Sequence, residues 1–78
     1  MDIKCIVGCI DSEGSPDFQL VTILDMTMDD YNNGIHYDTA KDIVENEGYE
    51  SRSVCDEHDA GFGIVNGHAL DWSTALTA

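Results

Sequence analysis

The fold is decided by the stretch Thr27–Tyr49, which reads TMDDYNNGIHYDTAKDIVENEGY. Thr27 followed three residues later by Asp30 resembles a capping box, so we expect a helix to begin here. At the other end, Gly48 suits the left-handed residue that terminates a helix, and Tyr49 suits the apolar contact that follows it. The stretch therefore carries its own start and stop signals.

The cluster Asn32-Asn33-Gly34 interrupts this stretch, because asparagine and glycine favour turns. We predict a short helical turn over Met28–Asn33 and a main helix from about Ile35 to Glu47. At about 100° per residue, the main helix is amphipathic. Its apolar arc contains Tyr37, Ala40, Ile43 and Val44, and its opposite side contains Asp38, Asp42 and Glu45, with Lys41 on the shoulder.

Alternating apolar residues on both sides of the helix predict strands. The predicted strands are Met1–Ile10, Phe18–Met26, Glu50–Cys55 and Phe62–Val65, with turns at residues 11–17, 56–61 and 66–67. Residues 68–78 form either a fifth short strand or a tail. The prediction is an α+β fold in one domain, residues 1–78. It has an antiparallel four-stranded sheet with one main helix on one face, in the order β-β-α-β-β.

The first two predicted strands are apolar on both faces. A single helix covers one face of such a sheet, so a second apolar face is left over. Either the stretch around Trp72 covers it or another copy of the chain does, which makes a homodimer one of the expected states.

The charge balance excludes several classes of function. The 78 residues include 16 Asp and Glu but only 3 Lys and Arg, for a formal net charge of −13. Such a chain is repelled by nucleic acid and by anionic membranes, and it favours a basic partner. No run approaches the ~20 apolar residues of a membrane span, no signal-peptide pattern opens the sequence, and the cysteines are odd in number. We expect a cytoplasmic protein with free thiols. Halophilic adaptation is a rival explanation of the acid excess.

Catalytic and metal-binding signals are weak. Cys55 and His58 lie three apart, but the sequence singles out no group to position them, and nearby carboxylates raise rather than lower a thiol pKa. Two acidic loops could gather a divalent ion, yet neither follows the order of a calcium-binding loop. Their residues are Asp11, Glu13 and Asp17 in one and Asp56, His58 and Asp59 in the other. We predict no enzyme, no cofactor and no metal site, with a metal-dependent sensor or enzyme as a third alternative.

The acidic surface is the strongest functional signal. Asp38 and Asp42 lie one helical turn apart, about 6 Å along the axis, which is close to the spacing of successive phosphates on one nucleic-acid strand. A protein that binds nucleic acid through lysines and arginines would meet such carboxylates as it meets a phosphate backbone. The predicted partner-binding residues are Asp29, Asp30, Asp38, Asp42, Glu45, Asp56, Glu57 and Asp59, with Tyr31, Tyr37 or Trp72 as an aromatic anchor.

In length, charge and element pattern, the chain is similar to small, very acidic phage proteins that inhibit restriction enzymes, uracil-DNA glycosylase or CRISPR effector complexes. No individual residue is carried over from those families. The expected function is a non-enzymatic inhibitor or interaction protein that mimics nucleic acid towards a basic partner. The alternative is a structural or regulatory binding module, or a homodimer, that uses an apolar sheet face and needs charge only for solubility.

Overall fold

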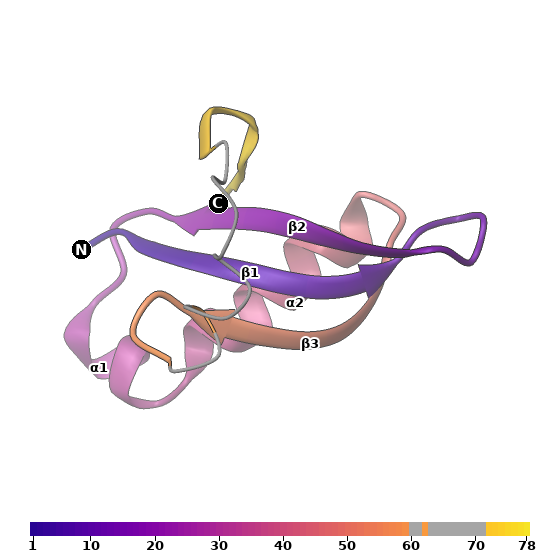
Figure 1. Cartoon of the computed structure of the whole chain (residues 1–78). Helices are drawn as coiled ribbons and strands as arrows, with labels where there is room; N and C mark the ends of the chain where they lie inside the picture. Colours follow the sequence, from indigo (N-terminus) through magenta and orange to yellow (C-terminus); the bar gives the residue numbers. More distant parts are fainter. Residues whose placement is uncertain (60–61, 63–71) are drawn as a thin grey trace.

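The computed structural model describes residues 1–59, 62 and 72–78. It shows an α+β fold in which a main helix lies across one face of a four-stranded sheet (Figure 1). The elements in chain order are β1 (Ile3–Ile10), β2 (Pro16–Ile23), α1 (Met28–Asn32), α2 (Ile35–Asn46), β3 (Glu50–Asp56), the short 3-10 helix η1 (Trp72–Thr74) and β4 (Leu76–Thr77).

Strand β1 is one of the two inner strands of the sheet and pairs antiparallel with both β2 and β3. The β1–β2 hairpin begins its register at Ile10 opposite Pro16. Its loop is held by the side chain of Asp11, whose Oδ1 accepts hydrogen bonds of 2.9 Å from the backbone N–H groups of Glu13 and Ser15. This local bonding is typical of an Asx turn and fixes the hairpin register.

The core lies between α2 and the sheet face that carries alternate residues of β1. These residues share one face because side chains two residues apart on a strand point to the same side. The buried cluster contains Ile3, Cys5, Val7 and Cys9 of β1, Val21 and Ile23 of β2, Met26, and Ala40 and Val44 of α2.

The helix boundaries agree with the signals in the sequence. Thr27 Oγ1 accepts a 3.1 Å hydrogen bond from the N–H of Asp30 at the start of α1. At the end of α2, Gly48 has φ +97°, and the N–H of Tyr49 donates to the carbonyl of Val44 at 3.3 Å. That bond and the one from Gly48 to Glu45 make a Schellman motif, so α2 ends where the glycine requires it to end.

The prediction of an all-antiparallel sheet is wrong. The sheet is mixed, with the spatial order β3-β1-β2-β4, because β4 pairs parallel with β2. Since β3 and β2 are both antiparallel to β1, β4 also runs parallel to β3, at the opposite edge of the sheet. Parallel neighbouring strands need a long connection instead of a tight hairpin, and residues 24–75 separate β2 from β4 in the sequence.

The bounds of the predicted strands differ from those in the structure, most clearly at the second strand. The second strand ends at Ile23 instead of Met26, because Asp25 adopts φ +56° and turns the chain out of the sheet. The predicted strand Phe62–Val65 and the turn at residues 66–67 lie outside the described residues, apart from Phe62. The fourth strand that the structure does show falls in the stretch where we expected a fifth strand or a tail.

The second face of the sheet is partly covered by the C-terminal stretch. The ring of Trp72 lies 5.3 Å from Lys4 Nζ, and Lys4 lies on the opposite face of β1 from the core. Phe62 stacks on Trp72 with ring centroids 6.0 Å apart, and Ile6 on this face is buried. Phe18 remains 60% exposed, so the coverage is incomplete.

Candidate functional site: carboxylates on the two helices

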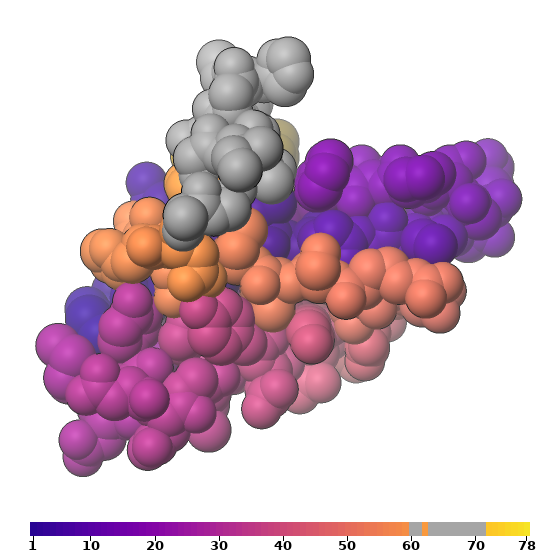
Figure 2. Space-filling model, turned by 60° about the horizontal axis from the view of Figure 1, so that its bottom comes forward, coloured from indigo at the N-terminus to yellow at the C-terminus, as the bar shows by residue number. Residues whose placement is uncertain are grey.

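Five of the predicted partner-binding carboxylates lie on α1 and α2, and all five are exposed. We call Asp29, Asp30, Asp38, Asp42 and Glu45 the helix carboxylates. Asp38 and Asp42 are one turn apart on α2, on the side away from Ala40 and Val44. In Figure 2, the residues of α1 and the start of α2 form a projecting end of the molecule, coloured magenta.

The short helix α1 holds Asp29 and Asp30 in its first turn, next to the Thr27 cap. Negative charge is favourable there because the first backbone N–H groups of a helix carry partial positive charge. Neither residue appears in an ion pair among the described residues. Both carboxylates are therefore directed to solvent by a local geometry that the sequence signals.

Little positive charge offsets these groups. The chain has three Lys and Arg residues, and all three lie in the described part. Lys4 lies beside Trp72 on the sheet, and Arg52 pairs with Glu50 at 3.4 Å. Lys41 is half-buried on the flank of α2.

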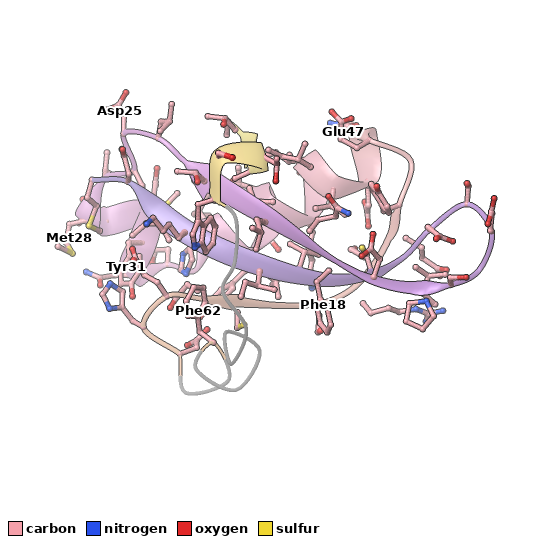
Figure 3. The ribbon with its side chains drawn as sticks, turned by 45° about the horizontal axis from the view of Figure 1, so that its top comes forward. Phe18, Asp25, Met28, Tyr31, Glu47 and Phe62 are labelled. Atoms are coloured by element: carbon pink, nitrogen blue, oxygen red, sulfur yellow. The ribbon has the colours of Figure 1, made fainter. Side chains whose placement is uncertain are left out.

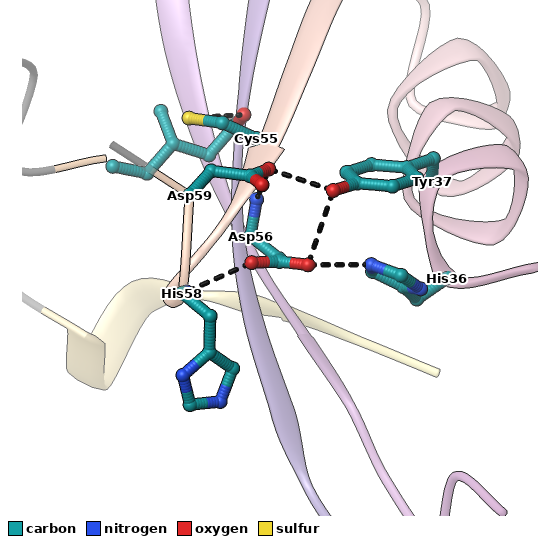
Figure 4. Close-up of polar contacts among 7 residues, drawn as sticks. His36, Tyr37, Cys55, Asp56, His58 and Asp59 are labelled. Carbon is teal, nitrogen blue, oxygen red and sulfur yellow. Dashed lines mark hydrogen bonds and ion pairs between the residues drawn. The ribbon is translucent and has the colours of Figure 1, made fainter. Parts of the chain in front are cut away.

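Asp56 does not lie on the surface, which corrects its place in the predicted partner-binding set. Its side chain is 2% exposed at the end of β3. Asp56 Oδ2 lies 2.7 Å from His36 Nε2 and accepts a 3.2 Å hydrogen bond from the Tyr37 hydroxyl (Figure 4). The backbone N–H of His58 donates to Asp56 Oδ1 at 2.8 Å. Asp56 therefore serves the interior of the protein.

Asp59 and Glu57 are half-buried, so their exposure lies between that of the helix carboxylates and that of Asp56. Asp59 Oδ2 accepts a 2.7 Å hydrogen bond from the Tyr37 hydroxyl and a 2.9 Å bond from the N–H of Asp56. The loop after β3 is thus fastened to the first turn of α2, beside Asp38. Among the carboxylates of the described part of this loop, Glu57 is the one whose side chain makes no hydrogen bond or ion pair.

The electrostatics of this buried network follow from its hydrogen bonds. Burial raises the pKa of Asp56, but donation from the His58 N–H, His36 and Tyr37 outweighs it, and the pKa of Asp56 lies below its ordinary value. The hydrogen bond to Asp59, together with burial, holds the pKa of the Tyr37 hydroxyl far above its usual range. At neutral pH, Asp56 is therefore a carboxylate and Tyr37 a neutral donor.

His36 was missed as a buried residue, because the wheel placed Tyr37 in the apolar arc instead. His36, Ala40 and Val44 follow the i, i+4, i+8 pattern and are the buried residues of α2. The His36 ring lies between two tyrosines, with centroids 4.7 Å from Tyr31 and 4.0 Å from Tyr37. A buried histidine is tolerated here because Asp56 pairs with its Nε2 and the two tyrosine rings pack against its ring.

The aromatic residues proposed as anchors are engaged within the protein. Tyr31 and Tyr37 are half-buried around His36, and Trp72 is half-buried beside Lys4. Because their rings already contact other side chains of the protein, we do not propose them as anchors for a partner.

The cysteines and acidic loops show no assembled reactive centre in the described part of the chain. Cys5, Cys9 and Cys55 are free thiols. The described residues contain no group of three His, Cys, Asp or Glu side chains placed to share a metal ion. In the same part of the chain, the helices are all too short and too polar to cross a membrane.

Comparisons with known proteins supply no identity. No protein-family model, curated protein or solved structure matches this chain. The functional assignment therefore depends on the chain's own charge, exposure and geometry.

Proposed function

We propose that the protein is a non-enzymatic, acidic interaction protein that presents the helix carboxylates to the basic, nucleic-acid-binding surface of a partner protein. The observation that carries the proposal is the exposure of all five helix carboxylates in a chain with a net charge of −13. Ordinary soluble surfaces mix both signs of charge, whereas these helices bear one half-buried lysine.

The buried network supports this role indirectly. It ties the first turn of α2 to the end of β3 through His36 and Tyr37. A rigid helix keeps successive carboxylates at a fixed spacing, which a disordered acidic tail does not do. Pre-organised charge of this kind increases the rate of association with a basic groove and fixes the register in which the two proteins bind.

The proposal is tested by competition with nucleic acid. The chain is first used to capture basic DNA- or RNA-binding proteins from a host lysate at low salt. A labelled nucleic-acid duplex or single strand is then bound to each captured protein, and the chain is titrated into the complex. We expect displacement of the nucleic acid from at least one captured protein. A chain that captures no such protein, or binds one without displacing its nucleic acid, contradicts the proposal.

A matched pair of variants separates local from overall charge. The helix triple variant carries Asp38→Asn, Asp42→Asn and Glu45→Gln, and the hairpin triple variant carries Asp11→Asn, Glu13→Gln and Asp17→Asn. Each removes three negative charges, which changes the net charge from −13 to −10. The helix triple variant should lose displacement activity, while the hairpin triple variant should retain most of it.

A second candidate is a binding module that uses the second sheet face. The observation that favours it is Phe18, which stays 60% exposed opposite Gly8 on that face. Salt distinguishes the two candidates. Binding through carboxylates weakens steeply between about 50 and 200 mM salt, while binding through an apolar face hardly changes.

A further inference from the structure

Large exposed apolar side chains are concentrated at one end of the molecule. Five such residues occur in the described structure, and four of them belong to the segments around α1. These are Met1 (48% exposed), Leu24 (44%), Met28 (60%) and Ile35 (41%), and the fifth is Phe18. We call these four residues the α1 end.

Backbone contacts bring these segments together. The N–H of Met26 donates to the carbonyl of Met1 at 2.7 Å, so the first residue of the chain lies beside the segment that leads into α1. Met28 is the first residue of α1, and Ile35 is the first residue of α2, which packs against α1. Figure 3 shows Asp25 and Met28 at the same end of the molecule, with Phe18 and Glu47 away from it.

Four exposed carboxylates lie next to residues of this apolar end. The N–H of Asp25 donates to Asp2 Oδ1 at 3.2 Å, which places these two exposed acidic residues side by side. Asp29 and Asp30 follow Met28 directly and are exposed. The chain's lysines and arginines lie in β1, the middle of α2 and β3, and the α-ammonium of Met1 donates to the Met26 carbonyl at 2.9 Å.

We infer that the α1 end is the apolar anchor site for a basic amphipathic segment of the partner, whose lysines and arginines lie over the neighbouring carboxylates. This inference rests on the proposed function, because it assumes that the partner protein is basic. Methionine side chains are flexible and polarisable, which suits them to contact apolar groups of varied shape. Association through charge alone gives rate and register, whereas buried apolar contacts supply most of the affinity.

Charge selects this occupant over the others. A second copy of the chain would bring the same carboxylates, and a net charge of −13, against each other. Nucleic acid and anionic lipid are repelled for the same reason. A segment that combines apolar residues with lysine or arginine satisfies both the exposed methionines and the carboxylates beside them.

The probe is a synthetic peptide with leucines at helical spacing i, i+3, i+4 and i+7 and lysines elsewhere. The control probe has the same composition in scrambled order, so that its charge is unchanged and its apolar face is lost. We expect the amphipathic peptide to bind at least about tenfold more tightly than the scrambled one, a difference of about 1.4 kcal/mol. Equal binding of the two peptides would overturn the inference.

A matched pair of variants locates the contact. Leu24→Gln with Met28→Gln removes exposed apolar surface at the α1 end and keeps the charge. Phe18→Gln removes a side chain elsewhere that is as exposed as Met28, at 60%. The double variant should abolish the preference for the amphipathic peptide, and Phe18→Gln should leave it intact. Unchanged preference in the double variant would overturn the inference.

Methyl NMR of the unmodified chain gives an independent readout that does not depend on the folding of a variant. The chain has three methionines, of which Met1 and Met28 are exposed and Met26 is 7% exposed. Titration with the amphipathic peptide should shift the Met1 and Met28 methyl signals far more than that of Met26. Shifts confined to other residues would contradict the inference, while the displacement assay with the helix triple variant decides the proposed function separately.

Discussion

His36 Nε2 lies 2.7 Å from Asp56 Oδ2, and this buried pair joins the first turn of α2 to the end of β3. Both residues are about as buried as the apolar core, at 2% exposure each. His36 Nδ1 is also buried, and it has no hydrogen-bond partner among the residues that the structure describes. The pair therefore has a cost in desolvation, and its contribution to the fold depends on both partners being present.

The Asp56 carboxylate should matter more for stability than any carboxylate on the surface. We expect Asp56→Asn to lower the free energy of unfolding by about 1–3 kcal/mol, because the charged acceptor of three hydrogen bonds is lost in a buried site. Asp38→Asn is the matched control and should change it by about 0.5 kcal/mol or less. Urea denaturation measures both, and equal losses would refute the structural role of Asp56.

The same residue should give stability a defined pH dependence. The pKa of Asp56 is lower in the folded protein than its ordinary value, so its contribution is present above about pH 4 and is lost as the pH falls through the folded pKa. Acid also relieves repulsion among the other carboxylates, so the useful quantity is the difference between wild type and Asp56→Asn. That difference should shrink below about pH 4. A difference that is constant from pH 7 to pH 2 would disagree with the network described here.

Single substitutions at the residues that begin and end the helices should lower the free energy of unfolding. Thr27→Ala removes the oxygen that accepts from the Asp30 N–H and should cost about 1 kcal/mol, while Thr27→Ser keeps that oxygen and should cost less. Gly48→Ala places a Cβ at φ +97° and should cost about 1–2 kcal/mol. Thermal and chemical unfolding measure these losses, and a neutral Gly48→Ala would mean that α2 does not end in a left-handed residue.

The three thiols should differ sharply in reactivity. Burial, with Asp56 adding to it, raises the pKa of Cys5 to about 12, and Cys9 is also buried. Cys55 is half-buried, although burial and Asp59 raise its pKa as well. Alkylation at pH 8 followed by peptide mass spectrometry should therefore modify Cys55 first, because thiolates react and the other two are shielded. In urea, where the chain is unfolded, the three cysteines should be alkylated at similar rates, which serves as the control. Similar alkylation rates in the folded protein would contradict the core packing.

Much of the fold follows from local signals in the sequence. The Thr27 cap and the Gly48 terminator fix the helices because each satisfies backbone groups within a few residues. The grouping of Ile3, Cys5 and Val7 on one face of β1 follows from alternation, but both faces of the strand are apolar, so alternation does not say which one packs against α2. The pairing of β4 with β2 did not follow, because a crossover between distant segments leaves no local pattern.

The sequence predicted the exposure of carboxylates on the main helix, but it did not predict which carboxylates are buried by contacts between distant segments. Asp38 and Asp42 were placed on the outer side of α2 by helical periodicity. Asp56 looked like another surface charge because it stands in an acidic turn. Its burial depends on His36, which is distant in sequence and which the helical wheel did not assign to the core. One polar pair across two elements therefore removed a residue from the predicted surface.

The affinity of the captured basic partner for the helix triple and hairpin triple variants, measured at about 50 and 200 mM salt, tests the central claim most directly. We predict that wild type and the hairpin triple variant bind with similar, steeply salt-dependent affinity. The helix triple variant should bind much more weakly and depend less on salt, because fewer charges then contact the partner. Equal weakening by both triple variants would show that only overall charge matters and would contradict a binding site on the helices.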